Sequence, residues 1–188
     1  MKILVKHRSI HPGTIQKHYP NAAIIDVTSK GPEPWVRFSP FYPHGGIPIP
    51  QSDAATSQSV EGIWQGLKVF ENQDIDIEKF ENNTMKRLKR TIQRFGKVRG
   101  HRFGIQNEQL LDYKNARINI YLPSYRWILD NCLQKEVQLL KEISQKQDIL
   151  LLDYETNTSV GNVSKPLSHA GLLRLYLMDA WPNETKVG

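Results

Sequence analysis

The sequence predicts a helix-rich α+β fold, with one domain over residues 1–188 and a small β-sheet. Short β-branched segments bounded by turn residues predict strands near the beginning of the chain. A long segment in the second half repeats its apolar residues at helical spacing, which indicates helices. A chain of 188 residues is long enough for one domain with a substantial core.

Strands are expected where short apolar segments lie between turn residues. They are KILVKH at 2–7, AAIIDVTS at 22–29, PWVRF at 34–38 and DILLLDY at 148–154. Residues 39–50 read SPFYPHGGIPIP, and four prolines and two glycines in this segment oppose a regular element. Each proline restricts its own φ, so this segment is expected to be a stiff loop that can form a pocket wall.

Helices are expected in four segments. The first begins after Ser59, a plausible N-cap, and continues to Phe70. The others run from about residue 76 to 95, from Pro123 through SYRWILDNCLQKEVQLLKEISQ, and through PLSHAGLLRLYLMD at 166–179. Gly96 is expected to end the second of them.

Positive charge is concentrated in one part of the chain. The formal net charge is +6, and eight basic residues with no acidic one lie between Met85 and Arg102. The remaining chain has 17 basic and 19 acidic residues. The side chains expected to bind nucleic acid are Arg87, Arg90, Arg94, Lys97 and Arg102. Such a segment predicts a polyanion site, although a solvated helix face with a basic bias explains it equally well.

Three polar side chains share one side of the helix expected after Ser59. Glu61, Gln65 and Lys68 are spaced i, i+4 and i+7. In a continuous helix, Glu61 and Lys68 would lie about 10.5 Å apart along the axis and bracket a group the size of a nucleoside. A carboxylate and an amine are both useful for breaking a glycosidic bond. The alternative is an ordinary solvated polar face.

Two glycines, Gly62 and Gly66, lie in the same helix. Each costs about 1 kcal/mol in a helix interior. Their presence therefore indicates the close approach of a ligand or of another backbone.

The loop and this helix together resemble the signature of a known family. Ser-Pro-Phe-Tyr-Pro at 39–43 is similar to the SNFYP loop of the NADAR (YbiA-like) N-glycosidases. Residues 59–70, SVEGIWQGLKVF, are similar to that family's SVEHYYQAQKF helix, with Glu, Gln and Lys in the same register. The Gly-Arg-rich stretch 96–100, a helix with Trp127 and the DILLLDYETN segment follow in the family's order.

The chain also departs from the family's pattern. Ile63-Trp64 stands where the family has an aromatic pair, and residues 166–170, PLSHA, replace its late Gly-Asn-Leu-Gly motif. These differences predict a divergent branch with a different substrate.

The resemblance implies cleavage of an N-glycosidic bond in a nucleotide or nucleic acid, DNA more than RNA. ADP-ribosylated guanine is a substrate that the resemblance suggests, with a place in phage defence or in a toxin–antitoxin system. A modified base in DNA is a variant of the same chemistry, and the eight basic residues favour a nucleic-acid substrate over a free metabolite. Glu61 would stabilise the sugar cation or activate water, and Lys68 would attack the sugar. The side chains expected to bind substrate are Phe41, Tyr42, Trp64, Gln65, Arg99, Asp153 and His169. Asp153 and His169 are equally well explained as a turn cap and a packed helix histidine.

A binding protein is the alternative to an enzyme, because a basic segment on a folded scaffold can grip nucleic acid without catalysis. No cofactor is expected, since the chain has none of the common nucleotide-binding glycine motifs. With the single cysteine Cys132 and no clustered acids, no zinc site is expected. The lone cysteine, the lack of a secretory signal and the absence of long apolar runs predict a cytoplasmic protein with no membrane partner.

Overall fold

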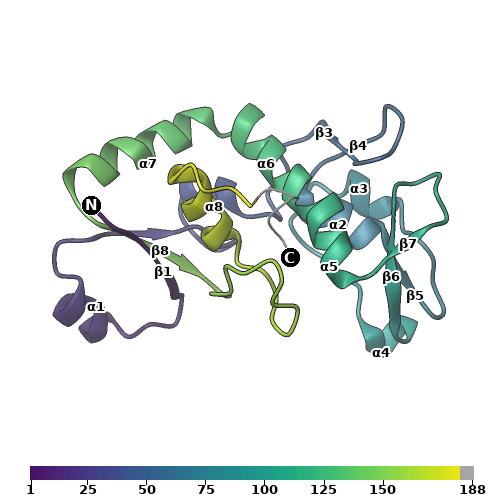
Figure 1. Ribbon diagram of the computed structural model, residues 1–188, viewed down its shortest axis with the longest axis horizontal. Coiled ribbons are helices and arrows are strands. Elements are labelled where there is room, and N and C mark those ends of the chain that lie inside the picture. Colours follow the sequence, from purple (N-terminus) through teal and green to yellow (C-terminus); the bar gives the residue numbers. More distant parts are fainter. Residues whose placement is uncertain (183–188) are drawn as a thin grey trace. The chain divides into compact units, whose positions relative to one another are not determined.

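The computed structural model describes residues 1–182, and its α+β class confirms the expected fold class (Figure 1). The chain divides into two compact units. The first combines Met1–Ser39 with the chain from Leu133 onward, and the second is the continuous segment Pro40–Cys132. Residues 183–188, which the expected single domain includes, lie outside the described part.

The first unit contains a parallel three-stranded sheet in the order β1 (Ile3–His7), β8 (Ile149–Asp153), β2 (Ala23–Asp26). The central strand β8 pairs with both neighbours, and all its residues are buried. A strand covered on both faces needs a continuous apolar run rather than alternation. The strands predicted at 2–7 and 148–154 are confirmed, and the one predicted at 22–29 is confirmed over Ala23–Asp26 only.

The helices of the first unit are α1 (Pro12–His18), the 3₁₀ helix η1 (Trp35–Phe38), α7 (Gln134–Lys146) and α8 (His169–Leu177). Helix α8 packs on β1 and β8. The prediction of a strand at 34–38 is wrong. The Arg37 backbone N–H donates to the Pro34 carbonyl at 3.2 Å, and the rings of Trp35 and Phe38 stack with centroids 6.4 Å apart. Proline lacks the N–H that a strand would donate, which favours the tight turn.

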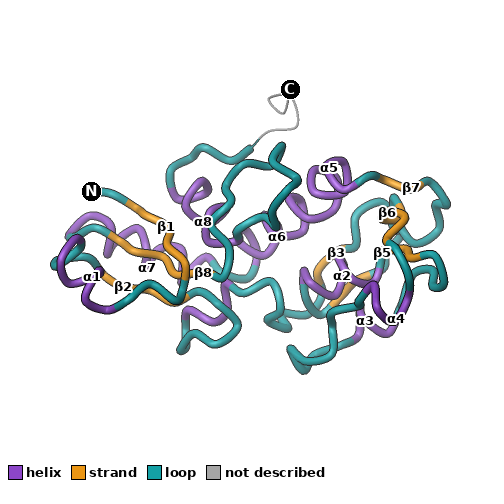
Figure 2. Tube along the Cα trace, turned by 90° about the horizontal axis from the view of Figure 1, so that it is seen from below, coloured by secondary structure: helices purple, strands orange, loops and turns teal. Residues whose placement is uncertain are grey.

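The second unit contains two small antiparallel sheets (Figure 2). One pairs β3 (Ile47–Pro48) with β4 (Thr56–Ser57), so the proline-rich loop contains one two-residue strand that the sequence did not predict. The other has the order β5 (Lys68–Phe70), β6 (Val98–Arg102), β7 (Leu110–Leu111).

The helices of the second unit are short. They are α2 (Val60–Gly66), α3 (Glu78–Glu81), α4 (Ile92–Phe95), α5 (Tyr113–Ala116), the π-helix η2 (Arg117–Tyr121) and α6 (Leu122–Asn131). The predicted helix over 76–95 is wrong. Met85 and Arg87 have φ angles of 58° and 57°, which no right-handed helix contains. The predicted end at Gly96 holds for α4, because Gly96 follows it with a φ of 81°.

Two other helix boundaries differ from expectation. Helix α2 ends at Gly66 rather than Phe70, because residues 68–70 pair with β6 as strand β5. The long helix expected from Pro123 is divided into α6 and α7 at Cys132 and Leu133. The helix also does not begin at Pro123 as expected, because α5, η2 and α6 follow one another without a break from Tyr113 to Asn131, and Pro123 lies inside this stretch, directly after the π-helix.

The close packing of α2 explains its two glycines. A Cβ on Gly62 would lie 2.6 Å from the Lys79 carbonyl oxygen, and one on Gly66 would lie 2.1 Å from the Phe80 ring. The neighbour is the α3 segment in both cases. At Gly62 it is backbone, as expected, and at Gly66 it is the Phe80 side chain. Of the helices within residues 1–182, none has the length and apolar character needed to cross a bilayer.

Candidate functional site

Helix α2 is held at its first turn by a cap and by the proline-rich loop. The Ser59 hydroxyl accepts a hydrogen bond from the Gly62 N–H at 3.0 Å, which confirms Ser59 as the N-cap. The Glu61 N–H donates to the Pro40 carbonyl at 2.8 Å. All residues of α2 are buried, so its polar side chains do not form a solvated face.

Glu61, Gln65 and Lys68 form a connected line of polar groups. The Gln65 Nε2 donates to the Glu61 carboxylate at 2.8 Å, and the Lys68 Nζ donates to the Gln65 Oε1 at 3.4 Å. The Arg90 backbone N–H also donates to that Oε1 at 3.1 Å. Gln65 therefore lies between the carboxylate and the amine, as its register predicts, although Lys68 lies on β5 and not on the helix.

The Lys68 amine is in a position that disfavours its charge. Burial lowers the pKa of Lys68 most, Glu61 opposes this, and the cations Arg90 and Lys89 lower it further. An amine with a lowered pKa is neutral more often at neutral pH, and only the neutral form is nucleophilic.

Trp64 lies at the centre of an aromatic group in the second unit. Its ring centroid lies 3.9 Å from that of His101, 5.8 Å from that of Tyr113 and 5.7 Å from that of Tyr121. The Lys68 Nζ lies 5.8 Å from the Trp64 ring, within reach of a cation–π contact. Trp64 thus forms a wall behind Lys68 and His101.

A pocket of about 350 Å³ opens beside these groups. Its lining residues are Lys68, Val98, Arg99, Gly100, His101, Asp112 and Tyr113. Lys68 and Arg99 were predicted from sequence, whereas His101, Asp112 and Tyr113 were not. Glu61, Trp64 and Gln65 do not line this pocket but connect to it through Lys68 and His101.

His101 lines the pocket and is almost fully buried, with 1% of its surface exposed. It is the cross-strand partner of Lys68 in the β5–β6 pairing. Burial, followed by the charges of Lys68 and Arg90, lowers the pKa of His101 to about 3, against a small opposite effect of the Trp64 backbone. The imidazole is therefore neutral at physiological pH.

The two aromatic residues predicted from the loop lie among other partners. Tyr42 is half-buried, and its ring centroid lies 4.8 Å from that of His44. The Lys89 Nζ lies 5.8 Å from the half-buried Phe41 ring. Neither side chain lines the pocket of Lys68, and their roles in binding substrate stay predictions.

A family of unknown function, DUF6939, matches residues 7–173. The chain belongs to this family. The matched segment covers most of both units and includes Glu61, Lys68 and His101. Neither curated proteins nor solved structures give a significant match.

In this DUF6939 member, the basic segment exposes six of its eight cations. They are Lys86, Arg87, Lys89, Arg94, Lys97 and Arg99. The prediction that Arg90 contributes to a nucleic-acid surface is wrong. Its guanidinium is buried and donates to the backbone carbonyls of Gln65, Lys68 and Asp74 at 3.1, 2.5 and 2.6 Å. Arg102 is half-buried and forms an ion pair with Asp74, which reduces its availability to a phosphate.

Asp153 and His169 meet in the first unit. The Asp153 Oδ2 accepts from the Ser168 hydroxyl at 2.7 Å and lies 3.1 Å from the His169 Nδ1. The His169 Nε2 lies 2.8 Å from the Val27 carbonyl oxygen. These contacts attach the start of α8 to the end of β8 and to the chain after β2, as the capping and packing alternative predicts. Their role in binding substrate stays a prediction.

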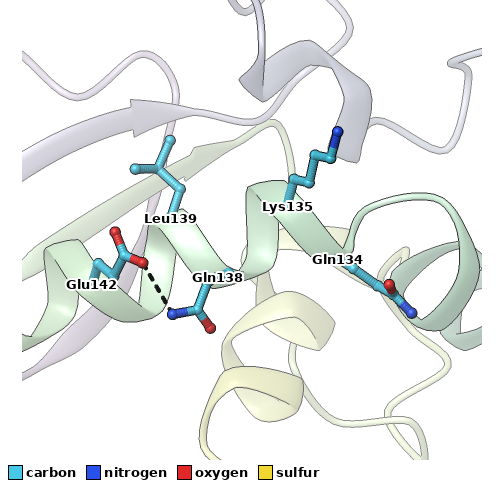
Figure 3. A pocket seen from close by; sticks show the side chains of 5 residues that line it. All are labelled: Gln134, Lys135, Gln138, Leu139 and Glu142. Carbon is cyan, nitrogen blue, oxygen red and sulfur yellow. Dashed lines mark hydrogen bonds between the residues drawn. The ribbon is translucent and has the colours of Figure 1, made fainter.

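Neither the exposed surface of α7 nor any metal-binding cluster offers a second candidate site in the described residues. The side chains of Gln134, Lys135, Gln138, Leu139 and Glu142 all project from α7 (Figure 3). Gln138 donates a hydrogen bond to Glu142 at 3.0 Å, and the other three point in different directions. Ligand sites instead need polar groups that converge on one point. Among residues 1–182, no cluster of three His, Cys, Asp or Glu side chains is placed to hold a metal ion.

Proposed function

We propose that this chain is an N-glycosidase that cleaves the base–sugar bond of a nucleotide or nucleic acid, DNA more than RNA. The observation that supports this most is the line from the buried Glu61 carboxylate through Gln65 to the Lys68 amine at the pocket. A carboxylate and an amine of lowered pKa are the two groups that glycosidic cleavage can use.

In the first step, the bond between the sugar C1′ and the base nitrogen breaks. Its electron pair leaves with the base, which takes up a proton, and positive charge develops on C1′ and the ring oxygen. The Glu61 carboxylate stabilises this cation or removes a proton from the water that attacks C1′. Both routes yield the free base and a sugar with a hydroxyl at C1′.

Lys68 offers a second route to the same products. Its neutral amine attacks C1′ as the base leaves, loses a proton, and forms an imine when the sugar ring opens. Water then adds to the imine, releases the sugar and restores the amine. The lowered pKa of Lys68 supports this route.

The charge around the pocket supports a phosphorylated substrate. Arg99 and Lys68 both line the pocket, and the exposed cations of residues 86–99 belong to the same unit. A guanidinium binds phosphate through two parallel hydrogen bonds. ADP-ribosylated guanine in DNA and a modified DNA base are the substrates to test first.

Glu61→Gln tests the carboxylate, since it preserves the size and the acceptor for Gln65 while removing the charge. We expect turnover to fall at least about a hundredfold, equivalent to about 3 kcal/mol, with substrate binding nearly intact. Product formation by mass spectrometry is the measurement. Glu81→Gln, an exposed acid on α3, is the matched control and should retain full activity.

Lys68 is tested by trapping. If an imine forms, borohydride reduces it to a stable adduct on the wild-type protein, and Lys68→Ala abolishes that adduct. If Lys68 only binds phosphate, no adduct appears and the substitution mainly raises KM. Full turnover by both Glu61→Gln and Lys68→Ala would contradict the glycosidase proposal.

The second candidate function is nucleic-acid binding without catalysis, which the six exposed cations of residues 86–99 favour. It predicts salt-sensitive binding that does not depend on Glu61. Binding without base release by the wild-type protein would favour this candidate.

A further inference from the structure

His101 has an unusual environment for a buried histidine. Both ring nitrogens are covered, and neither meets hydrogen-bond geometry with a protein partner, although the Trp64 backbone lies close enough to raise the pKa of His101. A buried polar atom without a partner costs folding stability, and an apolar side chain of similar shape avoids that cost. A phenylalanine would stack on Trp64 without two unpaired nitrogens, so packing alone does not account for a histidine here.

The position of His101 in the pocket indicates that its ring nitrogens are placed to bind a ligand. The ring forms the buried floor of the pocket whose other polar side chains are Lys68, Arg99, Asp112 and Tyr113. Cross-strand partners project from the same face of a sheet, so Lys68 is the neighbour of His101 across the strands. The hydrogen bond that holds the Lys68 amine is 3.4 Å long and therefore weak. A ligand can reach the imidazole only after a movement of the pocket lining, and the weak bond of Lys68 opposes that movement little.

We propose that His101 binds the substrate through a hydrogen bond from its neutral imidazole to a sugar hydroxyl, while Arg99 holds the phosphate of the same sugar. This deepens the proposed function, on which it rests for the class of ligand. Charge decides which group binds the hydroxyl and which binds the phosphate. A neutral imidazole offers one donor and one acceptor, which match a hydroxyl, whereas a phosphate is bound best by the Arg99 guanidinium.

The same arrangement gives His101 a role in specificity. A site with buried hydrogen-bonding groups rejects a ligand that lacks the matching hydroxyl, because the groups are then left unpaired. His101 is therefore expected to distinguish a sugar phosphate from a bare phosphate. Arg99 is expected to contribute to both.

The experiment compares ribose 5-phosphate with inorganic phosphate on the full-length chain, with binding followed by calorimetry and by tryptophan fluorescence. Trp64 is a suitable reporter because its ring lies 3.9 Å from that of His101. In His101→Phe we expect ribose 5-phosphate to bind about tenfold more weakly, the loss of one hydrogen bond, and inorganic phosphate to bind unchanged. His18→Phe, at an exposed histidine of the first unit, is the matched control and should change neither.

A second measurement needs no substitution. In the ¹⁵N-labelled wild-type protein, the His101 imidazole resonances should report a neutral ring at pH 6 and should shift with ribose 5-phosphate but not with phosphate alone. Unchanged ribose 5-phosphate affinity in His101→Phe, imidazole resonances that do not respond, or no saturable binding of ribose 5-phosphate would each overturn the inference.

The outcomes separate this inference from the proposed function. Base release that survives intact in His101→Phe, together with unchanged sugar phosphate binding, rejects His101 and leaves the glycosidase in place. Sugar phosphate binding that His101→Phe weakens, without base release by the wild-type protein, supports His101 and rejects the glycosidase.

Discussion

At the scale of single residues, Arg90 and His101 are both buried ionisable groups, but Arg90 is charged and His101 is neutral. Arg90 keeps its charge, because its guanidinium donates to three carbonyl oxygens and lies against the rings of Phe70 and Phe95 at 4.9 and 5.2 Å. His101 loses its charge, because burial and the nearby cations disfavour the imidazolium. One residue stabilises the unit, and the other is available for a ligand.

His101 should make the protein sensitive to acid. Its pKa is lowered to about 3 in the folded state, so the unfolded chain binds more protons as the pH falls below the ordinary histidine value of about 6.5. The stability from this group is complete above pH 6.5 and is lost as the pH falls toward 3, by up to about 1.4 kcal/mol per pH unit.

Urea denaturation of wild type and His101→Phe at several values between pH 4.5 and 7 measures this contribution. The wild type should lose more stability than the variant over that range, and His18→Phe should follow the wild type. Parallel pH profiles for wild type and His101→Phe would contradict it.

Arg90 should matter for stability. Arg90→Met preserves much of the apolar stem but removes the donors to three backbone carbonyls, which we expect to cost about 2–4 kcal/mol of unfolding free energy. Arg94→Met, at an exposed arginine of the same segment, is the control and should change stability by less than about 0.5 kcal/mol. Equal urea midpoints for the two variants would show that the Arg90 contacts contribute nothing.

At the scale of elements, α2 depends on the absence of two side chains. Gly62 and Gly66 let the chain around α3 approach so closely that a Cβ at either position would overlap with it. The buried α2 then presents Gln65 to Arg90 and Lys68, so the packing of a short helix positions the polar line. The π-helix η2, which directly precedes α6, supplies Tyr121 to the ring group around Trp64.

Gly66→Ala should destabilise the second unit. Alanine favours a helix over glycine by about 1 kcal/mol, but its Cβ would lie 2.1 Å from the Phe80 ring and force the ring out of place. We expect a net loss of about 1–3 kcal/mol in thermal or urea unfolding. Gly161→Ala has no atom within 4 Å of its added Cβ and should be nearly neutral. A reduced loss in the Phe80→Leu background would identify the ring as the cause, whereas an equal or higher Tm for Gly66→Ala would refute it.

At the scale of the whole molecule, charge is distributed unevenly. The net charge is +6, and six cations of residues 86–99 are exposed. If this segment binds nucleic acid, each phosphate contact contributes about −0.9 to the slope of log K against log salt on duplex DNA. Binding should therefore depend on where a charge lies and not only on the net charge.

The double variant Arg87→Gln/Arg94→Gln should weaken duplex DNA binding and reduce the magnitude of the salt slope by up to about 1.8. Lys2→Gln/Lys17→Gln removes the same charge from exposed positions of the first unit and is the matched control. Fluorescence anisotropy over a salt series measures both. Equal slopes for the two double variants would indicate that the basic segment is not the contact surface.

Local features were predictable because neighbours along the chain determine them. Ser59 caps α2 and Gly96 follows α4 as expected, and the apolar run of β8 is the buried central strand. The break in the helix expected over residues 76–95 was not predictable, because the positive φ angles of Met85 and Arg87 carry no signal in composition or periodicity.

The sequence by itself determined the α+β class, the strands of the parallel sheet, the helix cap at Ser59 and the register of Glu61 with Gln65. Each of these depends mainly on residues that are close together in the chain, within one helical turn or one strand. Tertiary structure alone decided that Lys68 leaves the helix for β5, that Arg90 is buried, and that His101 lies beside Lys68. Strand pairing and burial join residues far apart in the chain, and solvation and pKa depend on that surrounding rather than on residue type.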